Sequence, residues 1–528
     1  MTLTAVRSPT ILMSLVWAGL ATALGVLVVR LPIEYSLALL ISAALSLISI
    51  WEPALGLGLA MTLGPAKAFL GVAYPALPLD PGQIFFALAL AGWLARGLLR
   101  RAILLPRIWL LMPLGLYLAI GLFSLLPATS LEESLKEVLK WAEIAVSLVI
   151  LVSEAERGRW RWIVAGLLIA GVAQSLVGIW QYQFRESGPE HFRILGNHFR
   201  AYGSFEQPNP YGGFLGLIWP VAAGLALGHL TPHPRPLSPL PTASRLLAGK
   251  GGRGGEAGVR GEEQAPHQTL ANLTKSFFYH QPFRISFPLP SLAYSAAAVL
   301  CLIGLYVSFS RGAWLGAAAA ALAMIIALPR RLMVGLGLVM TALGGGWALN
   351  QAGLLPASLT SRLVDIANFT AITDVRGVLI TDVNFSIVER LAHWQAAVRM
   401  AEAHPWLGMG MGNYEAAYSA YHLLNWPNAL GHAHMIYLNV LAETGVIGLI
   451  AYLGLWIAIF GLTLQVIGRA HGVTRGLALG LLGAWAHFSA HQVFDNLYVN
   501  NIHFTLGALL ALLVCAARTA RSTRPTTL

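Results

Sequence analysis

The feature that most constrains this chain is a succession of apolar segments, each about as long as a membrane is thick. A helix needs ~20 mostly apolar residues to cross the hydrocarbon core of a bilayer. Unpaired backbone groups are costly in lipid, so such segments must form helices. The sequence therefore predicts an all-α polytopic membrane protein with about 12–14 transmembrane helices. The candidate segments are 11–30, 33–50, 53–70, 82–99, 108–126, 136–153, 161–181, 211–229, 291–309, 312–328, 331–350, 443–466, 475–492 and 499–516.

The composition excludes other classes of protein. Of the 528 residues, 56% are hydrophobic and only 11% are charged, against about 25% in a typical soluble domain. The chain also has too much apolar surface to remain disordered. Its 34 Lys and Arg residues exceed its 23 Asp and Glu residues, giving a formal charge of +11. Positive residues collect on the cytoplasmic side of membrane proteins, so this excess does not indicate a nucleic-acid partner.

The positions of the arginines predict an orientation. If the N-terminus is cytoplasmic, every short connection rich in arginine falls on the same side of the membrane. Both termini are then cytoplasmic. The arginines in question are Arg96, Arg100, Arg101, Arg107, Arg157, Arg159, Arg161, Arg330, Arg331, Arg469, Arg475, Arg518, Arg521 and Arg524.

The connections between the segments divide the chain. Residues 1–230 form a first group of transmembrane helices, and 291–517 form a second group that contains a large extracytoplasmic loop, 351–432. Between them, 231–290 is rich in Pro, Gly and Arg without apolar periodicity, so we expect a disordered cytoplasmic insertion. Residues 518–528 form a basic cytoplasmic tail.

The large loop contains a segment with helical periodicity. Leu391, Trp394 and Val398 recur on one face, which predicts an amphipathic helix lying on the outer membrane interface. The run PWLGMGMGNY that begins at Pro405 interrupts the pattern. Such a glycine-rich run can cradle a phosphate, but without a flanking strand a simple helix end is the better interpretation.

Ionisable groups beside apolar segments are candidate functional residues. Arg311 lies in a tight connection between two of them, on the predicted outer side. A guanidinium held there is a bidentate donor for phosphate or carboxylate. The alternative is an arginine that merely extends to the interface.

Histidines form two further candidates. His432 and His434 precede a segment that contains Glu443. A metal site needs three or more ligands, so acid–base or hydrogen-bonding chemistry is favoured and no metal is predicted. The alternative is that these histidines have only a structural role at an interface. His491 follows His487 by four residues and precedes Asp495 by four, which places all three on one helix face. A proton relay and hydrogen bonding between helices are the two interpretations, and the second is slightly favoured.

Four motifs together resemble one family. They are GSFEQPNPYGGFL at 203–215, SFSRGAWLG at 308–316, Arg390 followed by PWLGMGMGNY at 405–414, and GHAHMIYLNVLAETGVIGL at 431–449. In order and spacing they resemble the superfamily of O-antigen ligases and Wzy-type polymerases, which are bacterial membrane glycosyltransferases. One departure is Met435, which stands where the family has Asn, Ser or Gln after the histidine, and His432 is a candidate to compensate.

The resemblance implies a function and a site. The catalytic groups would be His434, Arg311 and Arg390. Residues expected to bind substrate are Arg200, Asn209, His432, Glu443, His491 and Asp495. The donor would be a glycan on undecaprenyl pyrophosphate, the acceptor a glycan or lipid, and the location the outer face of the bacterial cytoplasmic membrane. The resemblance implies no metal and no other cofactor.

Other functions remain open at this point. Ligase, polymerase and protein-glycosylating enzymes share these motifs. A different class is a secondary transporter, which polar helix faces and Gly/Pro-interrupted segments such as 53–70 would suit. Against a transporter, the two halves show no internal repeat, and the polar candidates cluster at one predicted membrane face.

Overall fold

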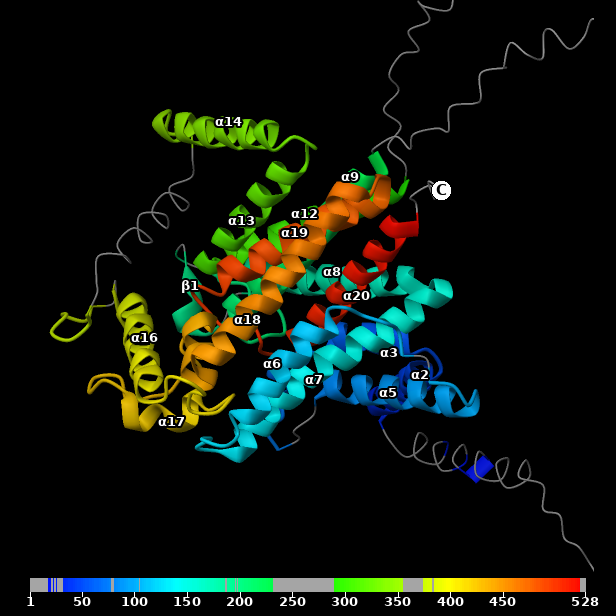
Figure 1. Cartoon of the computed structure of the whole chain (residues 1–528), viewed down its shortest axis with the longest axis horizontal. Helices are drawn as coiled ribbons and strands as arrows, with labels where there is room; N and C mark the ends of the chain where they lie inside the picture. Colours follow the sequence, from blue (N-terminus) through cyan, green and yellow to red (C-terminus); the bar gives the residue numbers. More distant parts are fainter. Residues whose placement is uncertain are drawn as a thin grey trace, which may run out of the picture.

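The chain folds into a bundle of helices, which confirms the predicted all-α membrane class (Figure 1). The computed structural model describes residues 32–522 except 77–79, 104, 186–187, 195, 197, 231–288, 355–373 and 382–383, together with residues 18, 19, 22 and 25. The helices are α2 (Ile33–Trp51), α3 (Pro53–Leu63), α4 (Ala66–Ala73), α5 (Pro81–Leu99), α6 (Leu111–Phe123), α7 (Leu131–Glu154), α8 (Trp160–Phe184), α9 (Pro208–Leu230), α12 (Leu289–Val307), α13 (Arg311–Ala327), α14 (Leu332–Gln351), α16 (Phe385–Ala403), α17 (Tyr414–Tyr421), α18 (Ile436–Arg469), α19 (Gly472–His491) and α20 (Ile502–Ser522). A two-stranded antiparallel hairpin, β1 (Arg193–Ile194) and β2 (His198–Phe199), pairs Arg193 with Phe199.

The described residues contain fewer candidate spans than the predicted 12–14, and part of the chain lies outside the described residues. Eight of the described helices are long and apolar enough to cross a membrane, or nine if the bent pair α3 and α4 counts as one span. Two apolar helices, α6 and α13, are shorter than a full span. The run Leu131–Phe184 is counted as one candidate span, although it contains two predicted segments. These segments correspond to α7 and α8, which meet at a π-helical turn where Gly158 has a φ of 80°. Every predicted segment from 33–50 onward coincides with a helix, whereas 11–30 lies almost wholly outside the described residues.

The interior of the bundle is built on α9, α19 and α20, which are buried along most of their length. Helices α9 and α19 cross in close contact through small residues, as membrane helices do when backbones approach. A Cβ at Gly224 would lie 2.3 Å from the Gly476 carbonyl oxygen. Helix α13 packs on α19 as well, which brings the N-terminus of α13 to the C-terminal end of α19.

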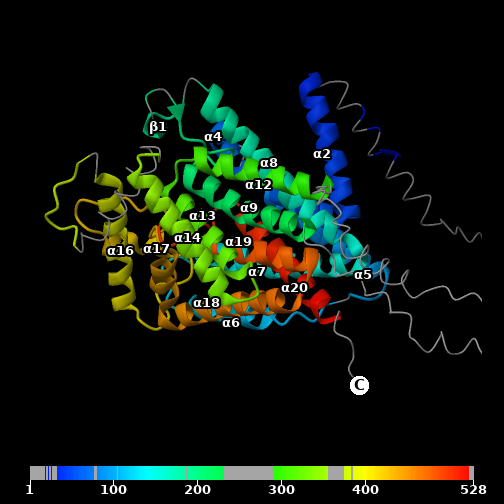
Figure 2. The same ribbon diagram turned by 90° about the horizontal axis from the view of Figure 1, so that it is seen from above.

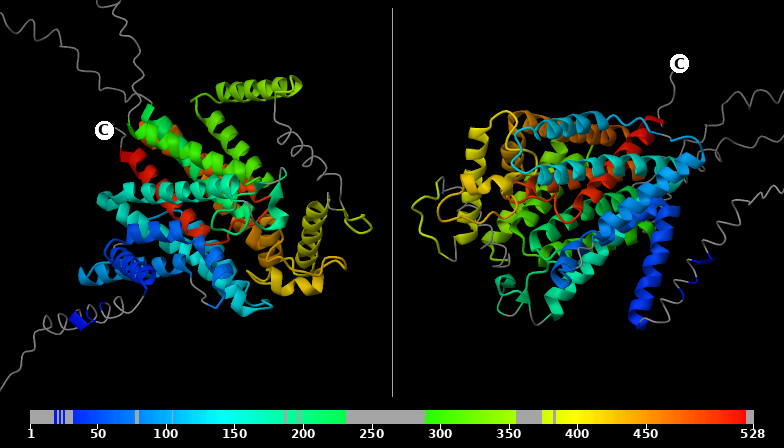
Figure 3. Two further views of the ribbon diagram at one scale, coloured as in Figure 1. Left: turned by 180° about the vertical axis from the view of Figure 1, so that it is seen from behind. Right: turned by 90° about the horizontal axis from the view of Figure 1, so that it is seen from below.

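Helices α16 and α17 lie at one end of the bundle, and the described C-terminal end of α20 lies at the other (Figures 1–3). The predicted helix of the large loop is α16, and it ends before Pro405 as expected. Its buried face differs from the predicted stripe. Val388, Leu391 and Ala396 are buried, but Val398 is 39% exposed. This face packs on α17 and α18, so other parts of the protein cover it instead of lipid.

Arginines gather at the opposite end, where they donate to carbonyl oxygens at the end of α13, which is Leu328, and in the connection before α6, which contains Arg107. Arg475 donates to the Leu328 oxygen at 2.8 Å, and Arg518 donates to the Arg107 oxygen at 2.9 Å. Cations are favourable there because carbonyl groups at helix C-termini carry partial negative charge. The placement of this end in the cytoplasm and the domain boundaries stay predictions. Of the expected insertion 231–290, only the last two residues are described.

Candidate functional site

Four segments meet at the end of the bundle that carries α16. They are the start of α13 with Arg311, the middle of α16 with Arg390, the loop 431–435 before α18, and the loop 492–501 after α19. Backbone bonding joins two of them, since the Ile436 N–H donates to the Gln492 oxygen at 3.0 Å. Residues that are far apart in the sequence therefore lie close together at this end of the bundle.

Two histidines and an aspartate form the centre of the site. His432 Nε2 lies 3.7 Å from Asp495 Oδ1, and His434 Nδ1 lies 3.8 Å from the same oxygen. The backbone N–H of His434 donates to His432 Nδ1 at 3.1 Å. A neutral imidazole that accepts at Nδ1 carries its proton on Nε2, so the His432 proton faces Asp495. Neither ring nitrogen of His434 has a hydrogen-bond partner among the described residues.

The backbone of His434 is in an uncommon conformation. Its φ is 53°, in the left-handed region that a residue with a Cβ rarely adopts. Such a conformation persists only where the surroundings hold it, and it is frequent at functional sites. Here the Asn439 side-chain oxygen accepts from the Ala433 N–H at 2.9 Å and fixes the loop to the first turns of α18.

Arg390 approaches the histidine–aspartate centre from α16. Its Nη1 donates to the Ser386 carbonyl at 2.8 Å, while its Nε is buried without a hydrogen-bond partner in the described part of the chain. Burial lowers the pKa of the Arg390 guanidinium, the charges of Asp495 and Glu389 oppose this shift, and the charge of Arg311 adds to it. The structure thus brings Arg311 and Asp495 each within electrostatic range of Arg390.

Arg311 stands at the first position of α13, in the tight connection that the sequence predicts. Ser310 caps the helix by accepting from the Ala313 N–H at 3.3 Å. The neighbouring Gly312 has no room for a side chain, since a Cβ there would lie 2.5 Å from the His491 ring. The N-terminal end of the helix adds partial positive charge beside the guanidinium. The arrangement suits an anionic ligand.

The titration of the central groups follows from their burial. Burial lowers the pKa of His432 to about 3, and the charge of His434 lowers it further. A third histidine, His393, lies on α16. Burial lowers its pKa to about 4. Burial raises the pKa of the Asp495 carboxyl, but the approach of His434 and of two further histidines outweighs burial and leaves this pKa below its ordinary value. At neutral pH, Asp495 is therefore charged while His432 and His393 are neutral.

These pKa values predict an acid-sensitive fold. Between pH 6.5 and about 4 the unfolded chain binds a proton at His393 that the folded chain does not. Stability therefore falls as the pH falls, with a slope of up to ~1.4 kcal/mol per pH unit for each such histidine. We expect the unfolding midpoint of the detergent-solubilised protein to drop between pH 7 and 5, and to drop less in His393→Gln. The exposed His404→Gln is the control, and equal slopes for both variants would contradict the prediction.

His393 and Glu389 were not identified from the sequence. The His393 ring lies 5.6 Å from that of His434 and stacks on Tyr418 at 4.8 Å. The Tyr414 hydroxyl donates to the His393 carbonyl and lies 3.0 Å from its Nδ1. Burial raises the pKa of Glu389, and His434 and Arg390 oppose the shift. The available signal was spacing, because residues three apart on a helix share a face and His393 follows Arg390 by three.

Glu443 is placed away from the two histidines. It is 7% exposed, and one carboxylate oxygen accepts from the Tyr414 N–H at 3.2 Å. Its backbone oxygen accepts from the Gly410 N–H at 2.9 Å, while a Cβ at Gly408 would lie 2.3 Å from its carbonyl carbon. Glu443 therefore anchors the glycine-rich run, and the run packs against α18.

Arg200 and Asn209 lie together beside the connection that precedes Arg311. Arg200 Nε donates to the Ser308 carbonyl at 3.0 Å, and its Nη2 donates to the Asn209 side-chain oxygen at 3.3 Å. Both residues therefore fix the position of that connection. Whether they bind substrate stays a prediction.

His491 and Asp495 do not share a helix face as predicted, because α19 ends at His491 and Asp495 follows in the next loop. His491 is 1% exposed, and neither ring nitrogen has a hydrogen-bond partner within the described ranges. The favoured interpretation, hydrogen bonding between helices, is therefore not observed for His491. Instead, its ring fills the space that Gly312 and Gly213 leave open.

One group of side chains could hold a metal ion. In the part of the chain that the structure describes, this group is His432, His434 and Asp495, whose ligand atoms lie within 4.8 Å of one another. Three protein ligands with an open position would suit a zinc ion. The guanidinium of Arg390, which acts on Asp495, opposes a second cation there. The site as a whole combines two arginines with a histidine–aspartate group.

Comparison with known proteins gives a match to a family model. Residues 296–453 match the family model described as O-antigen ligase. The matched region contains Arg311, Arg390 and His434, whereas Asp495 and Arg200 lie outside it. None of the curated proteins matches this sequence.

Proposed function

We propose that the chain, a polytopic membrane protein whose residues 296–453 match the O-antigen ligase family model, transfers a glycan from an undecaprenyl-pyrophosphate-type lipid to an acceptor. The acceptor is a glycan or a lipid, and transfer takes place at the outer face of the bacterial cytoplasmic membrane. The observation that carries the proposal is the meeting of two arginines with a histidine–aspartate pair at one end of the bundle.

The arginines suit the donor. Guanidinium groups bind phosphate oxygens through paired hydrogen bonds, which an ammonium group cannot reproduce. The buried Nε of Arg390 is available for such a bond. When the bond between the sugar and the pyrophosphate breaks, negative charge grows on the leaving phosphate. Arg311 and Arg390 stabilise that charge, and fixed donors are effective because they need no reorganisation during the reaction.

The histidine suits the acceptor. The acceptor hydroxyl attacks the anomeric carbon of the donor sugar, a new glycosidic bond forms, and the lipid pyrophosphate leaves. The hydroxyl proton passes to His434, whose ring nitrogens have no hydrogen-bond partner among the described residues. Asp495, at 3.8 Å, stabilises the imidazolium that results. A positioned base of this kind contributes typically ~10²–10⁴-fold to a rate.

The bent pair α3 and α4 would suit a transporter, but the placement of the polar groups favours a transferase. Transporters bind their substrates near the middle of the membrane, at discontinuous helices. The polar groups of the site gather instead at one end of the bundle, beside α16 and α17. A transporter would move a polar solute into sealed vesicles, whereas a transferase converts a lipid-linked glycan in detergent.

The mechanism requires no metal, so glycan transfer in detergent is expected to continue at an unchanged rate after treatment with a strong chelator. The physical reason is that the two guanidinium groups supply the charge that a divalent cation would otherwise provide. The measurement is turnover of lipid-linked glycan by the full chain, with and without chelator. Loss of turnover that added Zn²⁺ restores would show that His432, His434 and Asp495 hold a catalytic metal.

A further inference from the structure

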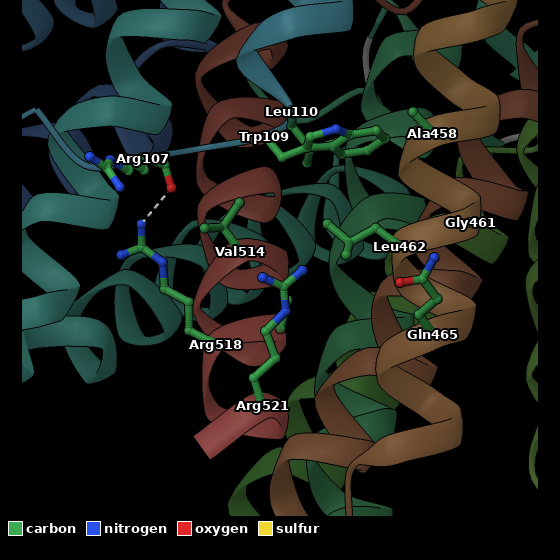
Figure 4. A pocket seen from close by; sticks show the side chains of 11 residues that line it. Arg107, Trp109, Leu110, Ala458, Gly461, Leu462, Gln465, Val514, Arg518 and Arg521 are labelled. Carbon is green, nitrogen blue, oxygen red and sulfur yellow. Dashed lines mark hydrogen bonds between the residues drawn. The ribbon is translucent and has the colours of Figure 1, made fainter. Parts of the chain in front are cut away.

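A cavity of about 320 Å³ lies near the end of the bundle opposite the candidate site. It opens between α18, α20 and the connection that leads into α6 (Figure 4). Helix α18 is broken at Gly445, which lies between His434 and the cavity. From Gly445 to Gln465, the rise of a helix places the cavity roughly 30 Å along α18 from that break. A ligand bound here would therefore not touch the groups that we assign to transfer.

Three arginines surround the cavity. Arg518 and Arg521 extend from the last turns of α20, and Arg107 extends from the connection before α6 (Figure 4). Arg518 forms an ion pair with Glu156 and donates to the Arg107 carbonyl oxygen at 2.9 Å, which fixes its position. The side chain of Arg521 has no ion-pair or hydrogen-bond partner among the described residues. Glu156 offsets only one of the three charges, so the cavity attracts an anion.

The rest of the wall is apolar. Trp109, Leu110, Leu462 and Val514 line it. The wall has no side chain at Gly461, where an added Cβ would meet nothing within 4 Å. A phosphate ion alone would make no contact with this apolar surface.

The apolar wall continues along the outward face of α18. Ile450, Ile457 and Leu464 follow one another at intervals of seven residues and are 65%, 71% and 53% exposed. Gly454 and Gly461 lie between them, and at both positions an added Cβ would meet nothing within 4 Å. This face is therefore apolar and free of side chains at two positions, and Gly461 belongs both to it and to the wall of the cavity.

We infer that this cavity binds one anionic glycerophospholipid of the inner leaflet, with its phosphodiester at Arg107, Arg518 and Arg521 and its acyl chains along α18. Basic pockets between membrane helices on the cytoplasmic side are suited to such headgroups. A second copy of the chain is disfavoured as the occupant, because two cavities with excess positive charge would repel each other.

The test is native mass spectrometry of the full chain in detergent with added phosphatidylglycerol or phosphatidylcholine. We expect a retained phosphatidylglycerol adduct and no retained phosphatidylcholine. Each of Arg107→Gln and Arg521→Gln should weaken phosphatidylglycerol binding roughly fivefold, since one basic residue near a lipid surface contributes about 1 kcal/mol. Arg331→Gln, an exposed arginine in the connection between α13 and α14, is the matched control and should bind normally.

A second variant tests the apolar part without changing the charge. Gly461→Leu places a side chain in the open space and should lower phosphatidylglycerol retention while leaving helix formation intact. Equal retention of both lipids, binding unaffected by all three variants, or displacement of the lipid by inorganic phosphate would overturn the inference. So would a dimer that Gly461→Leu dissociates, because a second copy would then occupy the face. Glycan transfer plays no part in this measurement, so its outcome is independent of the proposed function.

Discussion

Replacing His434 by alanine is expected to lower the turnover of glycan transfer by ~10²–10⁴-fold, the loss that removal of one general base typically causes. Donor binding should change far less, because the pyrophosphate contacts belong to Arg311 and Arg390. The measurement is kcat for transfer of a lipid-linked glycan in detergent, with donor affinity determined separately. A structural role alone would lower both quantities, or the yield of folded protein, together.

Two matched variants make this test specific. His404→Ala removes an exposed histidine just past the end of α16 and should leave turnover unchanged. His432→Ala removes the imidazole that accepts the His434 N–H and lies 3.7 Å from Asp495, so a smaller loss is expected. If His434→Ala kept full turnover and His432→Ala abolished it, His432 would be the base. Met435, which replaces a polar residue of the family pattern, makes that comparison necessary.

Replacing Arg390 by lysine is expected to lower turnover by roughly 10²-fold, although the charge is retained. An ammonium group cannot form the paired hydrogen bonds of a guanidinium. Lysine also has no donor equivalent to the Arg390 Nε, which is buried without a hydrogen-bond partner among the described residues. Lysine can still donate to the Ser386 carbonyl, so the fold of α16 should persist. The measurements are kcat, donor affinity and the unfolding midpoint.

Arg399→Lys is the matched control for this change, because Arg399 lies on the same helix and, among the described residues, donates only to the Tyr421 carbonyl, at 3.5 Å. It should retain turnover. Arg311→Lys should behave like Arg390→Lys, since both guanidinium groups act on the same phosphate groups. Full activity of Arg390→Lys with an unchanged donor affinity would remove Arg390 from the site.

The local features of the chain could be predicted because they depend on short stretches of sequence. Apolar length alone predicts a helix at each segment from 33–50 onward. The tight connection at Arg311 follows from two apolar segments that almost touch, with Ser310 as a capping residue. Pro405 and the glycines after it end α16 where expected. Backbone hydrogen bonding in lipid leaves such segments no alternative to a helix.

The relations between distant segments could not be predicted, because they depend on which helices pack together. Sequence spacing assigns Asp495 to the helix of His491, but α19 ends at His491 and the loop beyond it carries Asp495 to His432 and His434. The same packing turns Glu443 toward the glycine-rich run.

The sequence by itself therefore determined the membrane class, the positions of most helices and the residues that suit the chemistry. Only the tertiary structure decided which of these residues meet. It added His393 to the centre, separated α7 from α8 at the turn of Gly158, and grouped Arg107 with Arg518 at the far end. The physical reason is that helix formation in a membrane is local, whereas packing through small residues such as Gly224 and Gly312 is set by surfaces that meet only in the folded chain.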